Sequence, residues 1–141
     1  MMLLLDTNVV SELRKPAIRR ADQFNAWAET LSPWDTYLSV ITLLELRAGI
    51  EARRRNDPRQ AELLDAWLDN AVLPSYAGRV LDVDQHVADT AARLHVPDRR
   101  PAHDALIAAT AQVHNLVLVT RNESDFDPMG VSLVNPWRER A

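Results

Sequence analysis

Short apolar runs alternate along the chain with longer stretches in which apolar residues recur every three or four positions. The short runs are typical of buried strands in a parallel sheet, and the longer stretches are typical of helices. Strands are predicted at residues 3–5, 36–40, 80–83, 116–119 and 131–134. Helices are predicted at residues 7–15, 18–31, 42–55, 58–68, 84–94 and 101–114. Because strands and helices alternate, we expect an α/β fold in three layers, with a central, mainly parallel sheet of four to five strands flanked by helices.

The helix predicted to open at Pro101 is almost wholly apolar, and a helix that is apolar on every side is expected to be buried. Asp104 lies in its first turn. An ionised carboxylate in such surroundings is costly unless it is paired or bound to a metal ion. A favourable position at the helix dipole, worth about 0.3–1 kcal/mol, does not offset that cost.

The length of 141 residues fits one domain, and we expect a single domain over residues 1–141. There is no cysteine, which excludes a disulfide scaffold, a zinc–thiolate site and a thiol nucleophile. The apolar run at the start of the chain ends at Asp6, too early for a secretory signal, and no stretch is long enough to cross a membrane. We therefore expect a soluble, cytoplasmic protein that has no membrane partner.

The net charge of -4 argues against a general polyanion binder. Lys15 is the only lysine, so nearly all of the positive charge is on arginine, which pairs well with phosphate or carboxylate groups. The arginine runs at residues 53–55 and 99–100 are solvated faces or contacts to a nucleic acid or an acidic partner, and the sequence leaves both interpretations open.

Acidic side chains follow the predicted strands closely. Asp6 ends the first strand, Glu45 lies in the first turn after the second, Asp104 opens the apolar helix, and residues 122–125 follow the fourth strand. In open parallel sheets, ligands bind beyond the carboxyl ends of the strands. We therefore expect these four positions to meet in one crevice.

Each acid also has a purely structural interpretation. Asp6 could cap the next helix, and Glu45 could form a capping box with Thr42. Asp104 could interact favourably with the helix dipole, and Asp125 could be a turn residue. The shared location favours a functional cluster, because unrelated capping positions need not all face the same end of one sheet.

Clustered carboxylates raise one another's pKa unless a cation neutralises them. A site of oxygen ligands, without cysteine or converging histidine, suits Mg²⁺ or Mn²⁺ better than zinc. Bound Mg²⁺ keeps several water molecules, and one or two such ions can assist attack on phosphorus. The predicted chemistry is metal-assisted hydrolysis of a phosphodiester.

Four short motifs in this order and spacing resemble the PIN-domain family: Asp6-Thr7-Asn8, Thr42-x-x-Glu45-Leu46, Asp104-Ala105-Leu106-Ile107-Ala108 and Thr120-Arg121-Asn122-x-x-Asp125-Phe126. The ending Asn135-Pro136-Trp137 is similar to that of VapC-type toxins of bacterial toxin–antitoxin pairs. The resemblance covers essentially the whole chain. It implies a PIN-like fold and a Mg²⁺-dependent endoribonuclease.

By this resemblance, Asp6 and Asp104 would be the main metal ligands, and Glu45 would complete the cluster and activate or position water. Asp125 would be the fourth acid. Asn122 occupies a position that is often Asp in relatives, and it would support the site as an uncharged residue. The remaining supporting residues would be Thr7, Asn8 and Thr120. The family also implies an RNA substrate, a cognate antitoxin that blocks the cleft, and a homodimer or a larger assembly.

Other functional interpretations fit less well. A dinucleotide-binding domain needs a glycine-rich turn after the first strand, and the residues after Asp6 include none. A receiver or phosphatase of the phosphoaspartyl type needs a cation near the phosphoryl group, but Lys15, the only lysine, lies at the end of the first predicted helix. A metal- or phosphate-binding module, or a phosphatase without a toxin role, remains the alternative. His103 adjoins Asp104, but neighbouring helical residues point about 100° apart, so we expect a surface or structural histidine and not a catalytic one. The four tryptophans are expected in the core or at an interface.

Overall fold

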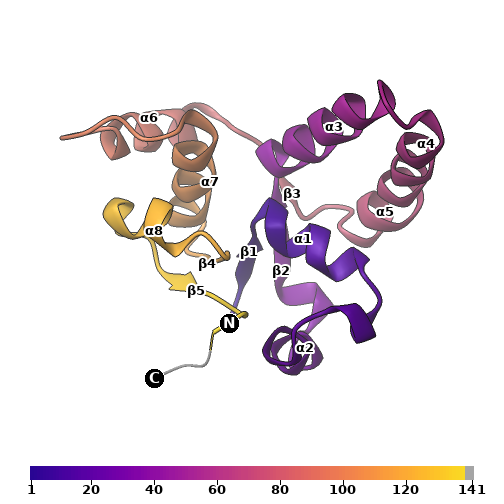
Figure 1. The fold of residues 1–141 in the computed structure, drawn as a ribbon. Helices are drawn as coiled ribbons and strands as arrows, with labels where there is room; N and C mark the ends of the chain where they lie inside the picture. The colour runs from indigo at the N-terminus through magenta and orange to yellow at the C-terminus, as the bar shows by residue number, and fades with distance from the viewer. Residues whose placement is uncertain (139–141) are drawn as a thin grey trace.

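The computed structural model describes residues 1–138, and its centre is a sheet of five parallel strands (Figure 1). The last three residues of the predicted 1–141 domain lie outside the described range. The strands follow one another in the sheet in the order β3-β2-β1-β4-β5. Their bounds are β1 (Leu3–Leu5), β2 (Thr36–Ser39), β3 (Val80–Leu81), β4 (Val117–Val119) and β5 (Leu133–Val134).

Helices connect all of these strands. The α-helices are α1 (Thr7–Arg14), α2 (Asp22–Glu29), α3 (Val40–Arg54), α4 (Pro58–Trp67), α5 (Leu73–Ser75), α6 (Gln85–Leu94), α7 (Ala102–Val113) and α8 (Glu123–Phe126). Short turns of 3₁₀-helix occur at η1 (Ala17–Arg19), η2 (Pro33–Asp35) and η4 (Asp127–Met129), and a π-helical turn, η3 (Leu68–Val72), joins α4 to α5. Within residues 1–138, no helix combines the length and the apolar character that a membrane crossing requires.

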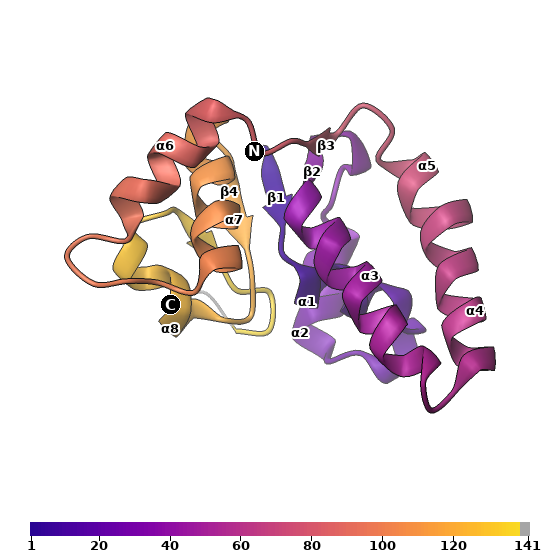
Figure 2. The same ribbon diagram turned by 90° about the horizontal axis from the view of Figure 1, so that it is seen from above.

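The central strand β1 divides the core in two. Leu4 packs into one apolar cluster with residues of α6, α7 and α8, whereas Leu3 and Leu5 pack into a second cluster with residues of α1, α2, α3 and α4. This alternation follows from the two-residue period of a strand. Figures 1 and 2 show the two groups of helices on opposite sides of the sheet. The predicted three-layer α/β architecture is confirmed.

The helix predicted over residues 18–31 is wrong at its start, because α2 begins only at Asp22. The guanidinium of Arg20 donates to the carbonyl oxygens of Leu13 (2.6 Å) and Lys15 (2.9 Å), and these bonds stabilise an extended backbone at Arg20. Ile18, the first residue of the predicted helix, is 92% exposed. Side-chain bonding to the preceding helix thus decides where α2 begins.

The second strand also ends earlier than predicted, at Ser39. The hydroxyl oxygen of Ser39 accepts a hydrogen bond from the backbone N–H of Ile41 (3.0 Å), which caps α3 and makes Val40 its first residue. The strands predicted at 80–83, 116–119 and 131–134 are confirmed in place but are shorter. Among the tryptophans, Trp34 does not belong to the core: it is 76% exposed and lies over the guanidinium of Arg79.

The apolar character of α7 is explained by its position. Ala105, Ile107, Ala108, Ala109 and Ala111 are fully buried, as predicted. The helix lies beside α6 and contacts β4, and the small side chains let its neighbours approach closely (Figure 2). Its amino terminus therefore stands at a defined place beyond the carboxyl ends of the strands.

Candidate active site

The predicted crevice corresponds to the region beyond the carboxyl end of β1, where the order of the strands reverses. The chain passes from β1 to β2 and β3 on one side, and it later adds β4 and β5 on the other side. Asp6 directly follows β1, and Thr120 directly follows β4. The backbone N–H of Asp6 donates to the carbonyl oxygen of Val119 (2.9 Å), which ties the two strand ends together. This is the point at which open parallel sheets bind their ligands.

Both carboxylate oxygens of Asp6 accept hydrogen bonds. Oδ1 accepts the backbone N–H of Thr7 (2.8 Å), and Oδ2 accepts the hydroxyl of Thr120 (2.7 Å) and, at 3.3 Å, the amide of Asn8. Asp6 is 5% exposed and is also the N-cap of α1, so the capping interpretation and the cluster interpretation both hold. Burial raises the pKa of Asp6, while the hydrogen bonds from Thr120 and Thr7 oppose that rise.

A second layer of bonds holds the donors of Asp6 in place. The side-chain oxygen of Asn8 accepts the backbone N–H of Arg121 (3.2 Å), and the Asn8 amide also lies 3.4 Å from the hydroxyl oxygen of Thr120. That hydroxyl oxygen accepts the backbone N–H of Asn122 (3.0 Å). The predicted supporting residues thus join α1 to the segment after β4. For Asn122, the contact is made by the backbone, and its side chain is exposed.

Glu45 reaches the same crevice from α3. Its Oε1 accepts the hydroxyl of Thr7 at 2.6 Å, so Thr7 bridges the Asp6 segment and Glu45. Because α3 begins at Val40 and is capped by Ser39, Glu45 lies in the second turn, not the first. The predicted alternative of a capping box with Thr42 is therefore wrong.

Asp104 lies in the first turn of α7 and is half-buried, which is less than its apolar neighbours suggested. Its pKa is raised from 3.8 to about 6, first by burial and then by the negative charges of Asp6, Asp125 and Glu45, while His103 lowers it. Each of these acids is close enough for its charge to act on Asp104. The four predicted acids, Asp6, Glu45, Asp104 and Asp125, thus gather in one region, which we call the carboxylate cluster.

The fourth member stands at the rim of the cluster. Asp125 was expected in a loop, but it lies in α8 and is exposed. A turn of helix forms there because Phe126 is fully buried in the core beside α7 and holds the segment down. Asp125 therefore faces the cluster from a short, anchored helix.

Sequence reasoning missed His103. Its side chain is exposed, as expected of a surface histidine, but its Nδ1 lies 3.4 Å from Oε2 of Glu45, a contact that the sequence did not predict. The angle between neighbouring residues of α7 does separate His103 from Asp104. However, Glu45 approaches from α3, and only the packing of the two helices reveals this contact.

The cluster fits a hard divalent cation in its chemistry. All four side chains offer carboxylate oxygens, and their mutual repulsion is relieved by a positive charge. Within residues 1–138, no three or more His, Asp or Glu side chains are arranged to bind one ion together. Mg²⁺ commonly uses one or two carboxylates and completes its shell with water, so it does not need a closed cage of side chains.

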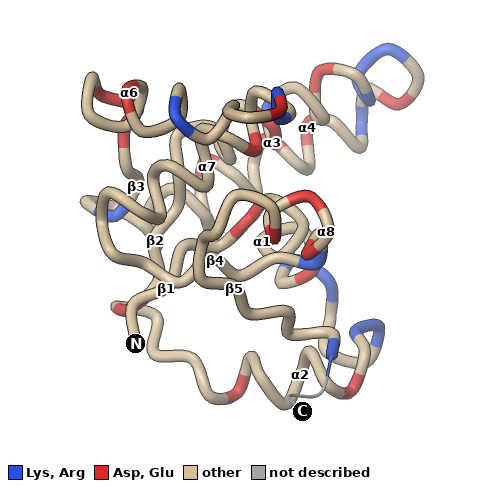
Figure 3. The backbone as a smooth tube through the Cα atoms, turned by 90° about the vertical axis from the view of Figure 1, so that its left-hand side faces the viewer, with Lys and Arg blue, Asp and Glu red and all other residues tan. Residues whose placement is uncertain are grey.

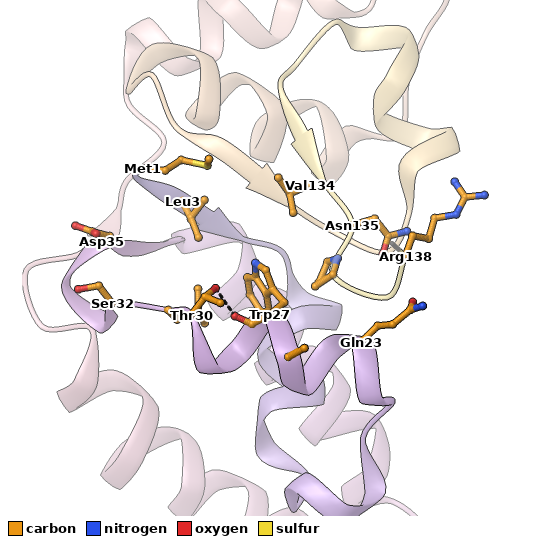
Figure 4. Close-up of a pocket in the computed structure, with 13 residues that line it drawn as sticks. Met1, Leu3, Gln23, Trp27, Thr30, Ser32, Asp35, Val134, Asn135 and Arg138 are labelled. Atoms are coloured by element: carbon orange, nitrogen blue, oxygen red, sulfur yellow. Dashed lines mark hydrogen bonds between the residues drawn. The ribbon is translucent and has the colours of Figure 1, made fainter. Parts of the chain in front are cut away.

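A separate pocket of about 560 Å³ lies between α2 and the C-terminal segment (Figure 4). Trp27, Leu31 and Val134 are among its lining residues, and no member of the carboxylate cluster lines it. The carboxylate cluster therefore lies apart from this pocket.

The PIN domain family matches residues 3–130. Two curated relatives match almost the full length of the chain. Toxin FitB of Neisseria gonorrhoeae is 36% identical over 98% of this chain and 100% of its own length. VapC ribonuclease Y4jK of Sinorhizobium fredii is 37% identical over 96% of this chain and 98% of its own length.

Solved structures agree with these relatives. A crystal structure of FitAcB from N. gonorrhoeae contains a chain that is 36% identical and superposes with a TM-score of 0.87, over 98% of this chain and 100% of that chain. A toxin-antitoxin complex from Klebsiella pneumoniae contains a chain that is 25% identical, with a TM-score of 0.63, over 97% of this chain and 99% of that chain.

The hydroxyl of Thr120 gives the first testable consequence of this geometry. In Thr120→Val, the buried carboxylate of Asp6 loses a donor at nearly constant side-chain volume, and we expect the free energy of unfolding to fall by about 1–3 kcal/mol. Urea unfolding in EDTA measures this change. Thr120→Ser, which keeps the hydroxyl, is the matched control. Equal stability of the Val and Ser variants would contradict the account.

The raised pKa of Asp104 predicts a pH-dependent stability. Between pH 3.8 and about 6, the folded chain binds a proton at Asp104 more tightly than the unfolded chain, so ionisation of this group destabilises the fold as pH rises through that window. In EDTA, Asp104→Asn should therefore gain melting temperature relative to the parent as pH rises to about 6, and the gain should then level off. A difference in melting temperature that does not change with pH, or a lower melting temperature of the variant at pH 7, would show that ionisation of Asp104 does not destabilise the fold.

Proposed function

The chain belongs to the PIN-domain family, and on that basis we propose that it is a metal-dependent endoribonuclease, the toxin of a toxin–antitoxin pair. One observation carries the proposal: acids from four separate segments gather at the point where the strand order reverses. The names of the two relatives, a toxin and a ribonuclease, support the same function for this chain.

Mg²⁺ is the proposed cofactor, with Mn²⁺ as an alternative. Asp6 and Asp104 are its proposed main ligands, with Glu45 and Asp125 completing the acidic site. When bound, the ion would offset the charge of the phosphodiester and lower the pKa of a water molecule.

The chain's own residues have distinct proposed tasks around that ion. Thr120, Asn8 and the backbone of Thr7 hold both oxygens of Asp6 in fixed directions. Glu45, which is held by the hydroxyl of Thr7, orients water or accepts its proton. Asn122 lies where the segment after β4 meets the crevice, and its exposed side chain is free to contact RNA there.

The proposed partners follow from the same function. The toxin–antitoxin complex among the similar structures supports a cognate antitoxin, whose segment would block the crevice. A homodimer, or a larger assembly with the antitoxin, is the proposed functional unit. An RNA substrate would place the protein in the cytoplasm.

Cleavage of a mixed RNA pool tests the proposal. We expect cleavage with Mg²⁺, none with EDTA, and none by Asp104→Asn with Mg²⁺, because the variant lacks one proposed ligand. An Arg19→Ala variant, altered on an exposed turn, should cleave like the parent and controls for preparation. Cleavage that survives chelation would reject the metal-dependent mechanism. Phosphate release from a monoester without RNA cleavage would favour the alternative, a phosphatase without a toxin role.

A further inference from the structure

Helices α3 and α4 form a hairpin that extends away from the sheet (Figure 2). The helix α3 starts beside the crevice, where it carries Glu45, and its far end turns into α4 at residues 55–57. Three arginines surround that turn: Arg53, Arg55 and Arg59. We call these three residues the hairpin tip. Figure 3 shows basic residues at this end of the hairpin, with acidic residues beside them.

The arginines of the hairpin fall into two classes. Arg47 pairs with Asp65 and Asp69, and Arg54 pairs with Glu51 and Asp65, so these two hold α3 against α4. The hairpin tip behaves differently. All three of its side chains are exposed, and within residues 1–138 none of them forms an ion pair or donates a side-chain hydrogen bond. Their donors are therefore available to a ligand.

Helix stability explains the position of Arg53 but not that of Arg59. Arg53 lies in the last turn of α3, where a positive charge is favourable to the helix dipole. Arg59 lies in the first turn of α4, where the dipole disfavours a positive charge. The nearby carboxylate of Asp57 already accepts the backbone N–H of Gln60 (3.1 Å). Arg59 thus has no stabilising task in the hairpin.

One face of α3 between Glu45 and the hairpin tip carries small side chains. Ala48, Gly49 and Ala52 are exposed along it. A Cβ atom at Gly49 would meet nothing within 4 Å, so packing does not require glycine there, although glycine weakens a helix interior. Small side chains on this face let an extended chain lie close to the helix between Glu45 and the tip.

Charge complementarity identifies the class of ligand. The chain carries a net charge of -4, and the carboxylate cluster repels a polyanion, so an RNA strand needs local positive charge to stay bound. Arg53 follows Glu45 by eight residues on the same helix, which is about 12 Å along its axis. The tip is thus within reach of a strand whose scissile bond lies at the cluster.

We propose that the hairpin tip binds backbone phosphates of single-stranded RNA, away from the bond that is cut at the carboxylate cluster. This inference rests on the proposed function for the identity of the substrate. Guanidinium groups suit the task because they form paired hydrogen bonds with phosphate oxygens. Contacts to phosphates position a strand without reading its sequence, so the tip would set affinity rather than the cleavage site.

The test measures RNA binding separately from cleavage. A fluorescein-labelled single-stranded RNA of mixed sequence is titrated, over a range of salt concentrations in EDTA, with full-length protein carrying Asp104→Asn. Adding Arg53→Gln and Arg55→Gln should reduce the slope of log affinity against log salt by about 1.4, since two phosphate contacts are lost. Arg19→Gln with Arg93→Gln removes the same charge from exposed positions elsewhere and should leave the slope nearly unchanged.

Arg59→Gln distinguishes binding from stability. The variant should reduce the salt slope by about 0.7 while its melting temperature stays the same or rises, because the arginine stands at the disfavoured end of α4. A fall in melting temperature with an unchanged slope would assign Arg59 to the fold and overturn its role in binding.

Two further outcomes separate the inference from the proposed function. If the tip and control variants bind RNA equally while the parent protein cleaves RNA with Mg²⁺, the function stands and the inference fails. If the parent cleaves nothing but only the tip variants lose RNA binding, the inference stands and the nuclease proposal fails. Loss of binding to a poly-glutamate peptide, with RNA binding unchanged, would assign the tip to an acidic protein partner and overturn the inference.

Discussion

The pKa of Asp104 rises to about 6, first because its carboxylate is partly buried and then because the negative charges of three other acids repel it. The fold creates this repulsion by directing the end of β1 and the starts of α3, α7 and α8 to one crevice. Hydrogen bonds compensate for part of it, since both oxygens of Asp6 and one oxygen of Glu45 accept donors. Within the described residues, Asp104 and Asp125 accept no such bond. A cation is the partner that would relieve the remaining repulsion.

The division between fixed and exposed groups suggests how the site works. Asp6 is buried and held from two chain segments by Thr7, Asn8 and Thr120, so its direction is set before any ligand arrives. Asp125 and the hairpin tip are exposed. Under the proposed function, they would be accessible to parts of an RNA strand beyond the bond that is cut. An acidic chain that acts on a polyanion needs this separation, because a cation at the cluster and arginines at a distance neutralise different parts of the strand.

Sequence patterns predicted the strands, the parallel sheet and the meeting of the acids, because these follow from apolar periodicity and from the geometry of strand ends. They failed where side chains from distant segments decide the outcome. Arg20 delays α2 by bonding to the end of α1, and Phe126 turns the expected loop around Asp125 into a helix. The contact of His103 with Glu45 depends on how α7 and α3 pack, which no local spacing encodes. The ligand roles of the four acids stay predictions.

The effect of Mg²⁺ on the thermal stability of the protein tests most directly whether the carboxylate cluster shares a cation. A ligand that binds only the folded chain raises its melting temperature with increasing concentration. We expect Mg²⁺ to stabilise the parent protein, which would lose its carboxylate repulsion, and to have little effect on Asp104→Asn. No stabilisation of the parent, or the same stabilisation of both proteins, would contradict the account.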